Sequence, residues 1–538
     1  MIHLKFKGFI LSIALFSLAL QSWAQIDQLA NKNSVINLKS NEILESLKLK
    51  NALKKLHNVY LNNQFQNLKN PINGDTLFTI MHIGDSHVQG DYFSGEIRMQ
   101  LQYQFGNAGR GILFPYALAK SFGPKGVSVK QSGFWTGLKT MSGSLVEPIG
   151  VAGYCATTNS PYSKIQVSLT EKFREENSLG IFSLPEFQKI KIWHSTDNQS
   201  YKVQLDSDWK LIDSFSHSDG WGYSIYLAEN VLQSFNLSLS KTSGIQNHFA
   251  FYGFEILPLH QKGIAYHHLG VVGAQFTHLI YKAPHTVEQI GKIKPDILIF
   301  SFGTNEAYNG KLDTAVYTPA IMNFIDEITR VSPKTAIVFT TAPDTRSNNR
   351  IPPLQIKVNN QLRKIVAEKN LTLYDLNEAM GGWGSLYAWY QNKLTISDKL
   401  HFNKVGYALQ GQLFSLSLLN AYNRVNKNDQ VKLDSLIFKV SQGMDILSRN
   451  RINVPQEENY PSDSVIKIDS IANSMIVSPS APRHEEKEII HVVKYGETLY
   501  RIALNYHVSV AVIAKKNKLN LRKKLKYGIK LRIPVTIQ

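Results

Sequence analysis

The segment between residues 263 and 420 alternates apolar strands with helical stretches, and this alternation constrains the fold more than any other feature of the chain. Residues 296–302 form a nearly unbroken apolar run, typical of a parallel strand buried on both faces. The elements expected after it are helix 319–330, strand 335–341, helix 353–370, strand 371–374 and helix 404–420. Such alternation predicts a doubly wound parallel sheet, in which sites form beyond the carboxyl ends of the strands.

A further strand lies well upstream and ends at a Gly-Asp-Ser turn. Residues 77–84 are apolar and β-prone, Asp85 and Ser86 follow, and a helix is expected over 93–105. A strand that turns directly into a helix can lift a serine hydroxyl out of the fold beside unpaired N–H groups. This geometry suits a nucleophile next to an oxyanion site, although a serine that only caps a helix would have the same local sequence.

Residues 116–262 have a different pattern and separate the two α/β segments. Short stretches of alternating polar and apolar residues recur between polar turns, at 164–169, 189–193, 201–205 and 235–239. This period of two predicts an antiparallel β-sandwich. We therefore expect an α/β domain of residues 74–115 and 263–420, with the sandwich inserted into it. Three aromatic residues of the insert are candidates for stacking on sugar rings, with burial in its core as the alternative: Trp209, Trp221 and Tyr223.

Three strand ends of the α/β domain carry residues suited to acyl transfer. Ser86 is the candidate nucleophile. His401 follows Asp398 by three residues, so His401 is a candidate base whose tautomer Asp398 can fix. Asn305 comes directly after the buried strand. Its amide, the backbone N–H of Ser86 and an N–H from a glycine turn are candidate donors to an oxyanion.

In this order of residues the chain resembles the SGNH (GDSL-type) hydrolases. Their blocks have counterparts here at Gly84–His87, Gly270–Gln275, Gly303–Glu306 and Asp398–His401. The resemblance implies a flavodoxin-like, three-layer α/β fold and a serine esterase with Ser86, Asp398 and His401 as catalytic residues. It also implies an oxyanion hole formed by Ser86, Gly273 and Asn305.

Two positions depart from the usual pattern of that family. His87 stands in place of the leucine that gives the family its name, and Glu306 stands where many members have aspartate. Both variants resemble branches that act on cell walls and sugars. An exported SGNH domain split by a β-sandwich is similar to peptidoglycan O-acetylesterases, which implies a carbohydrate-binding-like insert. The implied substrate is the 6-O-acetyl group of N-acetylmuramic acid.

The tail, residues 491–538, is compact and basic. Its eleven Lys or Arg and single acid, Glu497, contribute +10 to the formal net charge of +18, so the charge is local and does not favour a nucleic acid partner. The tail resembles a LysM domain in residues 492–503, 508–510, 517 and 527–534. This implies a βααβ fold that binds glycans containing N-acetylglucosamine, chiefly peptidoglycan or chitin. Before it, residues 421–490 predict a helix and then a flexible, Pro- and Ser-containing linker.

The first 24 residues have the pattern of an export signal. Two lysines precede the apolar run 9–20, and Ser22 and Ala24 are small residues at the positions that signal peptidase reads. We expect cleavage after residue 24, a periplasmic or wall-associated protein, and no membrane span in the mature chain. Residues 25–73 predict a helical arm without assigned chemistry.

We expect neither a metal ion nor a cofactor. His82, His267 and His268 lie near the proposed site, but adjacent histidines on a strand point to opposite faces and no carboxylate pattern completes a metal site. Cys155 is the only cysteine, so an internal disulfide is excluded. The residues around Cys155 offer no paired base, so a thiol nucleophile is not expected.

Other functions remain open from the sequence. An acetyl-serine could pass its acetyl group to a sugar hydroxyl, as in an O-acetyltransferase, or the enzyme could act on acetylxylan or another polysaccharide. An alternative of a different class is a non-catalytic cell-wall-binding protein. The presence of Ser86, Asn305, Asp398 and His401 argues against that alternative.

Overall fold

The structure is a computed structural model that describes residues 59–68, 77–123, 126–142, 149–170, 187–257, 262–308, 312–347, 351–449, 486–493, 502, 506, 513–514, 516–519 and 528–536. The chain divides into two compact units, residues 1–455 and 456–538. The predicted export signal, most of the predicted helical arm and the predicted linker from residue 450 to 485 lie outside the described residues.

A five-stranded parallel sheet forms the centre of the first unit. Its strands stand in the order β13 (Gly263–Gly270), β1 (Leu77–Gly84), β14 (Ile297–Ser301), β15 (Ala336–Thr340) and β16 (Thr372–Tyr374). Counted along the chain, this is the order 2-1-3-4-5 of flavodoxin-like sheets. The predicted doubly wound α/β fold is therefore confirmed, and the insertion separates the first strand from the second.

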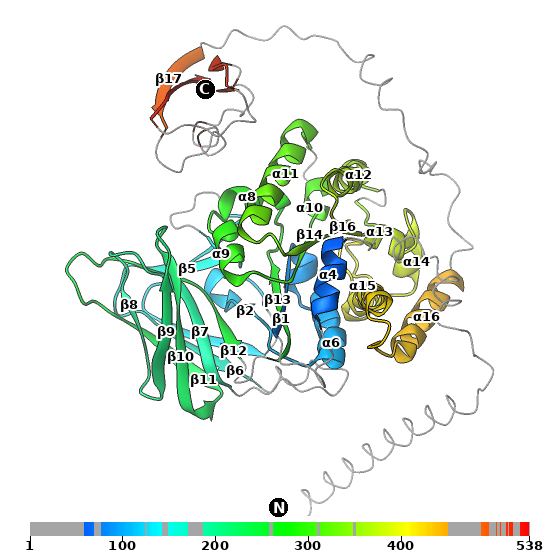
Figure 1. Ribbon diagram of the computed structural model, residues 1–538, viewed down its shortest axis with the longest axis horizontal. Helices are drawn as coiled ribbons and strands as arrows, with labels where there is room; N and C mark the ends of the chain where they lie inside the picture. The colour runs from blue at the N-terminus through cyan, green and yellow to red at the C-terminus, as the bar shows by residue number, and fades with distance from the viewer. Residues whose placement is uncertain are drawn as a thin grey trace, which may run out of the picture. The chain divides into compact units, whose positions relative to one another are not determined.

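Helices cover both faces of this sheet (Figure 1). One face packs against α4 (Val59–Asn67), α6 (Phe93–Phe105) and α15 (Lys404–Val425). The other packs against α8 (Phe276–Lys282), α9 (Thr286–Ile293), α11 (Thr314–Val331) and α12 (Pro353–Glu368). Neighbouring strand residues alternate between the faces, so that Ile80 joins the first core and Met81 the second.

The helical region after the sheet differs in detail from the prediction. The last helix was expected to end near residue 420, but α15 continues to Val425 because Ala421 and Tyr422 still face the core. A turn follows, and α16 (Asp434–Arg449) packs against α15. The predicted helix within residues 421–448 is therefore the end of one helix and most of another.

The insert consists of two antiparallel sheets. The larger follows the order β4 (Thr136–Lys139), β5 (Tyr154–Thr158), β12 (Phe249–Leu257), β7 (Phe187–Ser195), β10 (Trp221–Leu232) and β9 (Trp209–Ser216). The smaller follows the order β3 (Val127–Ser132), β6 (Lys164–Leu169), β11 (Ser234–Ser240) and β8 (Lys202–Leu205). Phe235 of β11 contacts Phe254 of β12 with ring centroids 5.3 Å apart, so the sheets share a core.

The insert begins earlier than the sequence predicted. The boundary was placed at residue 116, but β2 (Ile112–Leu113) already pairs with β12 of the larger sheet. A strand of two residues is too short to show an alternating pattern, which is why the sequence did not reveal it.

Two of the three candidate sugar-stacking residues are core residues. Trp221 is fully buried and stacks on Trp193, while Trp209 is buried against Phe187. Tyr223 is half-buried, with Lys191 and Lys292 over its ring. Alternation along a strand shows that one face is apolar but not that its aromatic rings reach solvent. The suggestion that Trp209 and Trp221 bind sugars is therefore wrong.

The second unit contains an antiparallel pair, β17 (Glu486–Val492) and β18 (Lys530–Thr536). Its small core consists of Val493, Ile502, Ile513, Leu531 and Ile533. The side chain of Asn517 bonds both the N–H and the C=O of Arg532. The strand begins at residue 486, inside the predicted linker, because pairing of an exposed charged segment uses the backbone and leaves no apolar pattern. The predicted Gly-Glu-Thr-Leu turn and most of the two predicted helices lie outside the described residues.

Among the helices that the structure describes, none is long and apolar enough to cross a membrane.

Candidate active site

Ser86 lies where β1 meets a one-turn helix, α5 (Ser86–Gln89). Asp85 caps this helix, because its Oδ1 accepts the backbone N–H of His87 at 3.0 Å. The strand can turn this sharply only with glycine at position 84, where a Cβ would lie 2.5 Å from Val88 Cγ2 and 2.6 Å from the Ser301 carbonyl oxygen. Ser86 itself is half-buried, so its hydroxyl is held at the surface of a rigid turn.

The structure brings Ser86, His401 and Asp398 into one hydrogen-bonded series. Ser86 Oγ lies 2.9 Å from His401 Nε2, and His401 Nδ1 lies 2.7 Å from Asp398 Oδ2. Asp398 therefore fixes the tautomer in which Nδ1 carries the proton and Nε2 can accept one from Ser86. Ser86 and His401 are 315 residues apart in sequence, and the sheet places them together at its carboxyl edge.

A tight turn holds Asp398 beside His401. Asp398 Oδ1 accepts the backbone N–H groups of Leu400 and His401 at 2.8 and 2.9 Å, while Lys399 adopts a φ of +54°. Partial burial opposes ionisation of Asp398, but the backbone and ring hydrogen bonds from His401 hold the pKa of this carboxyl below its usual value. The carboxylate is therefore charged at neutral pH and faces the imidazole.

The predicted oxyanion donors Gly273 and Asn305 lie on segments that hydrogen bonds connect to Asp85, the residue preceding Ser86. Gly273 occupies the third position of a turn closed by the Ala274 N–H and the Val271 carbonyl, with a φ of +78° that favours glycine. Asn305 lies in α10 (Thr304–Tyr308), directly after β14. Its Nδ2 donates to the Ala274 carbonyl at 2.9 Å and lies 3.2 Å from Asp85 Oδ2. Asn305 is thus linked both to the glycine turn and to the residue preceding Ser86.

Two buried carboxyl groups flank this side of the site. Burial raises the pKa of Asp85 to about 8, with the nearby Glu306 carboxyl as a smaller cause and the His87 N–H bond acting against it. Burial likewise raises the pKa of Glu306 to about 7. Glu306 accepts the backbone N–H groups of Phe276 and Gly303 at 2.7 and 3.0 Å, which ties α8 to the turn after β14. This structural role was not visible in the sequence.

Asp91 belongs to a buried ion-pair cluster below the turn. Its carboxylate contacts Arg98 at 2.9 Å and also contacts Arg110, and His268 Nδ1 lies 3.8 Å away. Burial opposes ionisation, but Arg98, His268 and Arg110 together hold the pKa of Asp91 well below its usual value. The cluster fixes the segment between α5 and α6, so Asp91 stabilises the position of the Ser86 turn without contacting the reacting groups.

The histidines considered as metal ligands are dispersed. His267 Nδ1 accepts the backbone N–H of Ile112 at 3.1 Å, whereas His268 points to the Asp91 cluster. His82 bonds Tyr266 and Ser301 inside the sheet layer. Within the described part of the chain, no group of three or more His, Cys, Asp or Glu side chains is arranged to hold a metal ion.

Comparison with known families identifies two regions. The profile of the GDSL-like lipase/acylhydrolase family matches residues 249–409, and that of the LysM domain matches residues 491–534. The first match includes Gly273, Asn305, Asp398 and His401, while Ser86 lies upstream of it. No curated protein sequence matches the chain significantly.

Several solved structures resemble the chain. A peptidoglycan O-acetylesterase is similar over 68% of this chain and 96% of its own, with 21% identity and a TM-score of 0.55. A lipase/acylhydrolase from Enterococcus faecalis is similar over 30% of this chain and 77% of its own, with 23% identity and a TM-score of 0.23. The first likeness extends over about two thirds of this chain, and its TM-score indicates that the two proteins share a fold.

Proposed function

Since this chain carries a GDSL-like lipase/acylhydrolase domain and a LysM domain, we propose that it is an exported serine esterase that removes O-acetyl groups from peptidoglycan. The observation that carries the esterase activity is the series Ser86–His401–Asp398, with contacts of 2.9 and 2.7 Å. The LysM domain and the likeness to a peptidoglycan O-acetylesterase favour the 6-O-acetyl group of N-acetylmuramic acid as substrate.

In the proposed reaction Ser86 Oγ attacks the acetyl carbonyl carbon and gives its proton to His401 Nε2. The resulting imidazolium is stabilised by Asp398 and donates that proton to the departing sugar oxygen, which leaves an acetyl-serine. A water molecule then gives a proton to His401 and attacks the acetyl carbon. His401 returns the proton to Ser86 Oγ as acetate departs.

The proposed oxyanion hole consists of the backbone N–H groups of Ser86 and Gly273 and the side-chain amide of Asn305. One proton of the Asn305 amide is held by the Ala274 carbonyl at 2.9 Å. The other faces Asp85 Oδ2 over a longer distance of 3.2 Å and is the one available to the tetrahedral oxyanion. Donors held in advance by the fold need little rearrangement when charge develops on the oxygen.

The insert is proposed to help bind the glycan, but through other residues than those first considered. Phe134 and Tyr162 are 84% and 83% exposed, an unusual state for large aromatic side chains. Their loops are tied together, because Ser163 Oγ accepts the Phe134 N–H at 3.2 Å. A pair of exposed rings on such fixed loops suits stacking on sugar faces.

The LysM domain is proposed to anchor the enzyme to wall glycans containing N-acetylglucosamine. Its surplus of Lys and Arg also favours an anionic polymer. Together with the export signal expected in residues 1–24, this supports a periplasmic or wall-associated location for the mature protein. The esterase and the anchor then act on the same polymer.

Acetate release separates this proposal from its alternatives. The full chain should release acetate from O-acetylated peptidoglycan faster than from acetylated xylan, acetylated chitin or a soluble acetyl ester. Ser86→Ala should abolish release, whereas the control Ser128→Ala, on an exposed position of β3, should not. Unchanged release in Ser86→Ala would contradict the esterase and favour a wall-binding protein. Acetyl transfer to added glycan that outruns release would indicate a transferase, and preference for xylan would indicate another substrate.

Sedimentation with purified peptidoglycan tests the anchor. The full chain should co-sediment, and a chain ending before β17 should stay in solution while keeping its activity on the soluble ester. Equal sedimentation of both chains would contradict anchoring by the LysM domain.

A further inference from the structure

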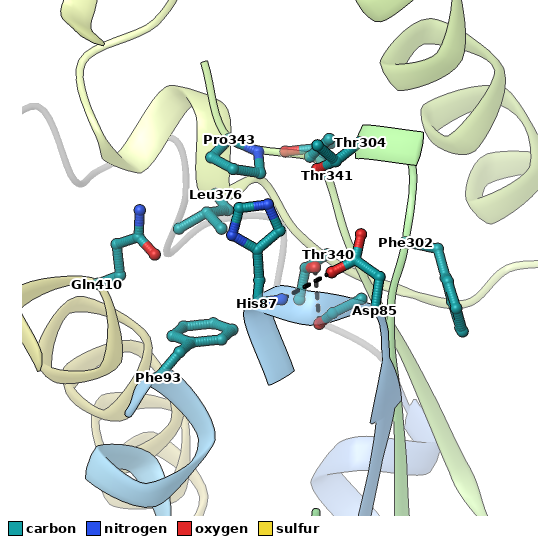
Figure 2. A pocket seen from close by; sticks show the side chains of 12 residues that line it. Asp85, His87, Phe93, Phe302, Thr304, Thr340, Thr341, Pro343, Leu376 and Gln410 are labelled. Atoms are coloured by element: carbon teal, nitrogen blue, oxygen red, sulfur yellow. Dashed lines mark hydrogen bonds between the residues drawn. The ribbon is translucent and has the colours of Figure 1, made fainter. Parts of the chain in front are cut away.

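A small cavity lies behind the Ser86 turn, bordered by Asp85 and His87 (Figure 2). The space open to the centre of a water molecule is about 10 Å³, roughly what one bound water needs. Several further residues of its wall carry polar side chains: Ser301, Thr304, Thr340, Thr341 and Gln410. A cavity of this size can hold a water molecule where several polar groups are within reach to bind it.

The hydrogen bonds around His87 determine which of its ring nitrogens carries the proton. His87 Nδ1 lies 2.9 Å from the Oη of Tyr407, on α15. Among the described residues, His87 Nδ1 is the one acceptor within hydrogen-bond distance of this hydroxyl, so the proton of Tyr407 is directed to it. Nδ1 is therefore an acceptor, and the neutral ring carries its proton on Nε2. Burial, with the nearby His401 as the next cause, lowers the pKa of His87 to about 3 and keeps the ring neutral.

The Nε2–H of His87 is a donor without an acceptor in the described part of the chain, and it is fully buried. His87 as a whole is only 7% exposed. In Figure 2 its ring points toward Thr341 and Pro343 in the cavity wall. Buried polar groups in native proteins are almost always paired, with ordered water when no protein atom is within reach. A water molecule in the cavity would accept this N–H.

The cavity lies between the two halves of the site. On one side the ring of His87 packs against that of His401, with centroids 5.3 Å apart and planes inclined by 32°. On the other side the Asp85 carboxyl accepts from the amide of Asn305. A water that accepts from His87 Nε2–H and donates to the Asp85 carboxyl would join these sides without placing a charge in the interior.

We propose that this cavity binds one water molecule, and that the water, His87 and Tyr407 position His401 and Asn305 for the reaction. The proposal rests on the proposed esterase function for its kinetic part only. The hydrogen bonds run in one direction, from Tyr407 O–H to His87 Nδ1, from His87 Nε2–H to the water, and from the water to Asp85. His87 and Tyr407 are positioning residues, since they act through His401 and Asn305.

A neutral ring behind His401 has a specific advantage. His401 becomes an imidazolium while it holds the proton of Ser86, and a second cation against its ring would disfavour that state. His87 supplies a flat surface for the ring of His401, and its own proton is committed to the cavity water. The Tyr407 bond keeps His87 in this tautomer throughout.

A high-resolution crystal structure of the full chain tests the water site without reference to activity. Density for a water within hydrogen-bond distance of His87 Nε2 and of the Asp85 carboxyl is expected. An empty cavity, in a map that shows other buried waters, would overturn the proposal. So would a protein atom bonded to His87 Nε2.

Kinetics test the positioning role. Tyr407→Phe should lower kcat on a soluble acetyl ester about tenfold or more, with KM changed less than about twofold. The matched control is Tyr374→Phe, which removes the hydroxyl of another buried tyrosine that stacks on Phe414 of α15 at 4.1 Å. Equal kcat in the two variants, after thermal melting shows that both are folded, would overturn the positioning role.

Conservative replacement of His87 separates positioning from packing. His87→Asn keeps an acceptor for the Tyr407 hydroxyl, so it should retain more kcat than His87→Leu, even if His87→Leu melts at the higher temperature. The proton resonance of His401 Nδ1–H, bonded to Asp398, should broaden in His87→Leu and stay sharp in His87→Asn. The same activity and the same resonance in both variants would overturn the proposal. If wild type and Ser86→Ala both released no acetate, the proposed function would fail, while the crystal structure and the resonance would still decide this inference.

Discussion

Asp85 offers a sharp test of the electrostatics at this site. The carboxyl is 1% exposed, and burial raises its pKa from 3.8 to about 8. In the unfolded chain it titrates near its ordinary value. Between these two pH values the folded protein holds a proton at Asp85 that the unfolded chain has lost, so the contribution of Asp85 to stability falls as pH rises. It is fully present below pH 3.8 and is lost as pH rises through about 8.

The magnitude follows from linkage. One proton of difference changes the free energy of unfolding by about 1.4 kcal/mol per pH unit. Asp85→Asn removes this dependence, because an amide does not titrate in this range. The mutant loses one hydrogen bond, since its amide nitrogen faces either the His87 N–H or the Asn305 amide, but that loss is independent of pH. Relative to wild type, Asp85→Asn should therefore gain about 3 kcal/mol of stability between pH 5 and pH 7.

Urea unfolding at a series of pH values, followed by tryptophan fluorescence, measures this difference. All seven tryptophans precede residue 390, so their signal reports on the first unit and not on the LysM domain. A stability difference that stays constant from pH 5 to pH 7 would refute the reasoning. It would mean that Asp85 is ionised in the folded protein and that the Asn305 amide and the His87 N–H suffice to hold a buried carboxylate.

The same titration should appear in activity. Above pH 8 a carboxylate accumulates 3.2 Å from the Asn305 amide and opposes the negative charge of the oxyanion. The kcat/KM of wild type on a soluble acetyl ester should therefore fall through a midpoint near 8. Asp85→Asn should lack this alkaline limb, whatever its absolute activity.

The remaining predictions concern single contacts. Asp398→Asn should lower kcat about 10⁴-fold with the fold intact, since the amide can no longer hold His401 in the required tautomer. Steady-state kinetics measure kcat and circular dichroism measures the fold. A loss of less than tenfold in kcat would contradict the role of Asp398. Asn305→Ala should lower kcat about 10²- to 10³-fold with little change in KM. Asn305→Asp should be no more active than Asn305→Ala, because its carboxylate repels the oxyanion. Arg98→Met should destabilise the first unit by about 3 kcal/mol in the fluorescence assay, because Asp91 keeps its buried charge with fewer partners; an unchanged midpoint would show that Arg110 alone neutralises it.

Much of the fold follows from local patterns in the sequence. The apolar runs 77–84 and 296–302 predict strands, and the structure has β1 at Leu77–Gly84 and β14 at Ile297–Ser301. The helix expected over 93–105 has the same bounds as α6. Ser86, His401 and Asp398 could be nominated because their residue types and their places after strands are local properties. The parallel sheet then brings these strand ends to one edge.

Other features could not be predicted from the sequence because they depend on which distant segments pack together and exclude water. The burial of Trp221 arises from its packing against Trp193 and against His285, which directly precedes α9 and lies 64 positions later in the chain. The short strand β2 exists because β12 offers it a pairing edge. Neither fact leaves a periodic signal in the sequence.

At the Ser86 turn, some features follow from the local sequence and others depend on the tertiary structure. Backbone preference and apolar periodicity act over a few residues, so they predict a strand that stops at Gly84 and a serine directly after it, with candidate partners downstream. Three other features can be seen only in the folded chain: Asp85 is buried near Glu306, His87 packs against His401, and Tyr407 Oη bonds His87 Nδ1. Those facts depend on desolvation and on contacts between distant segments, and they decide the charges that surround Ser86.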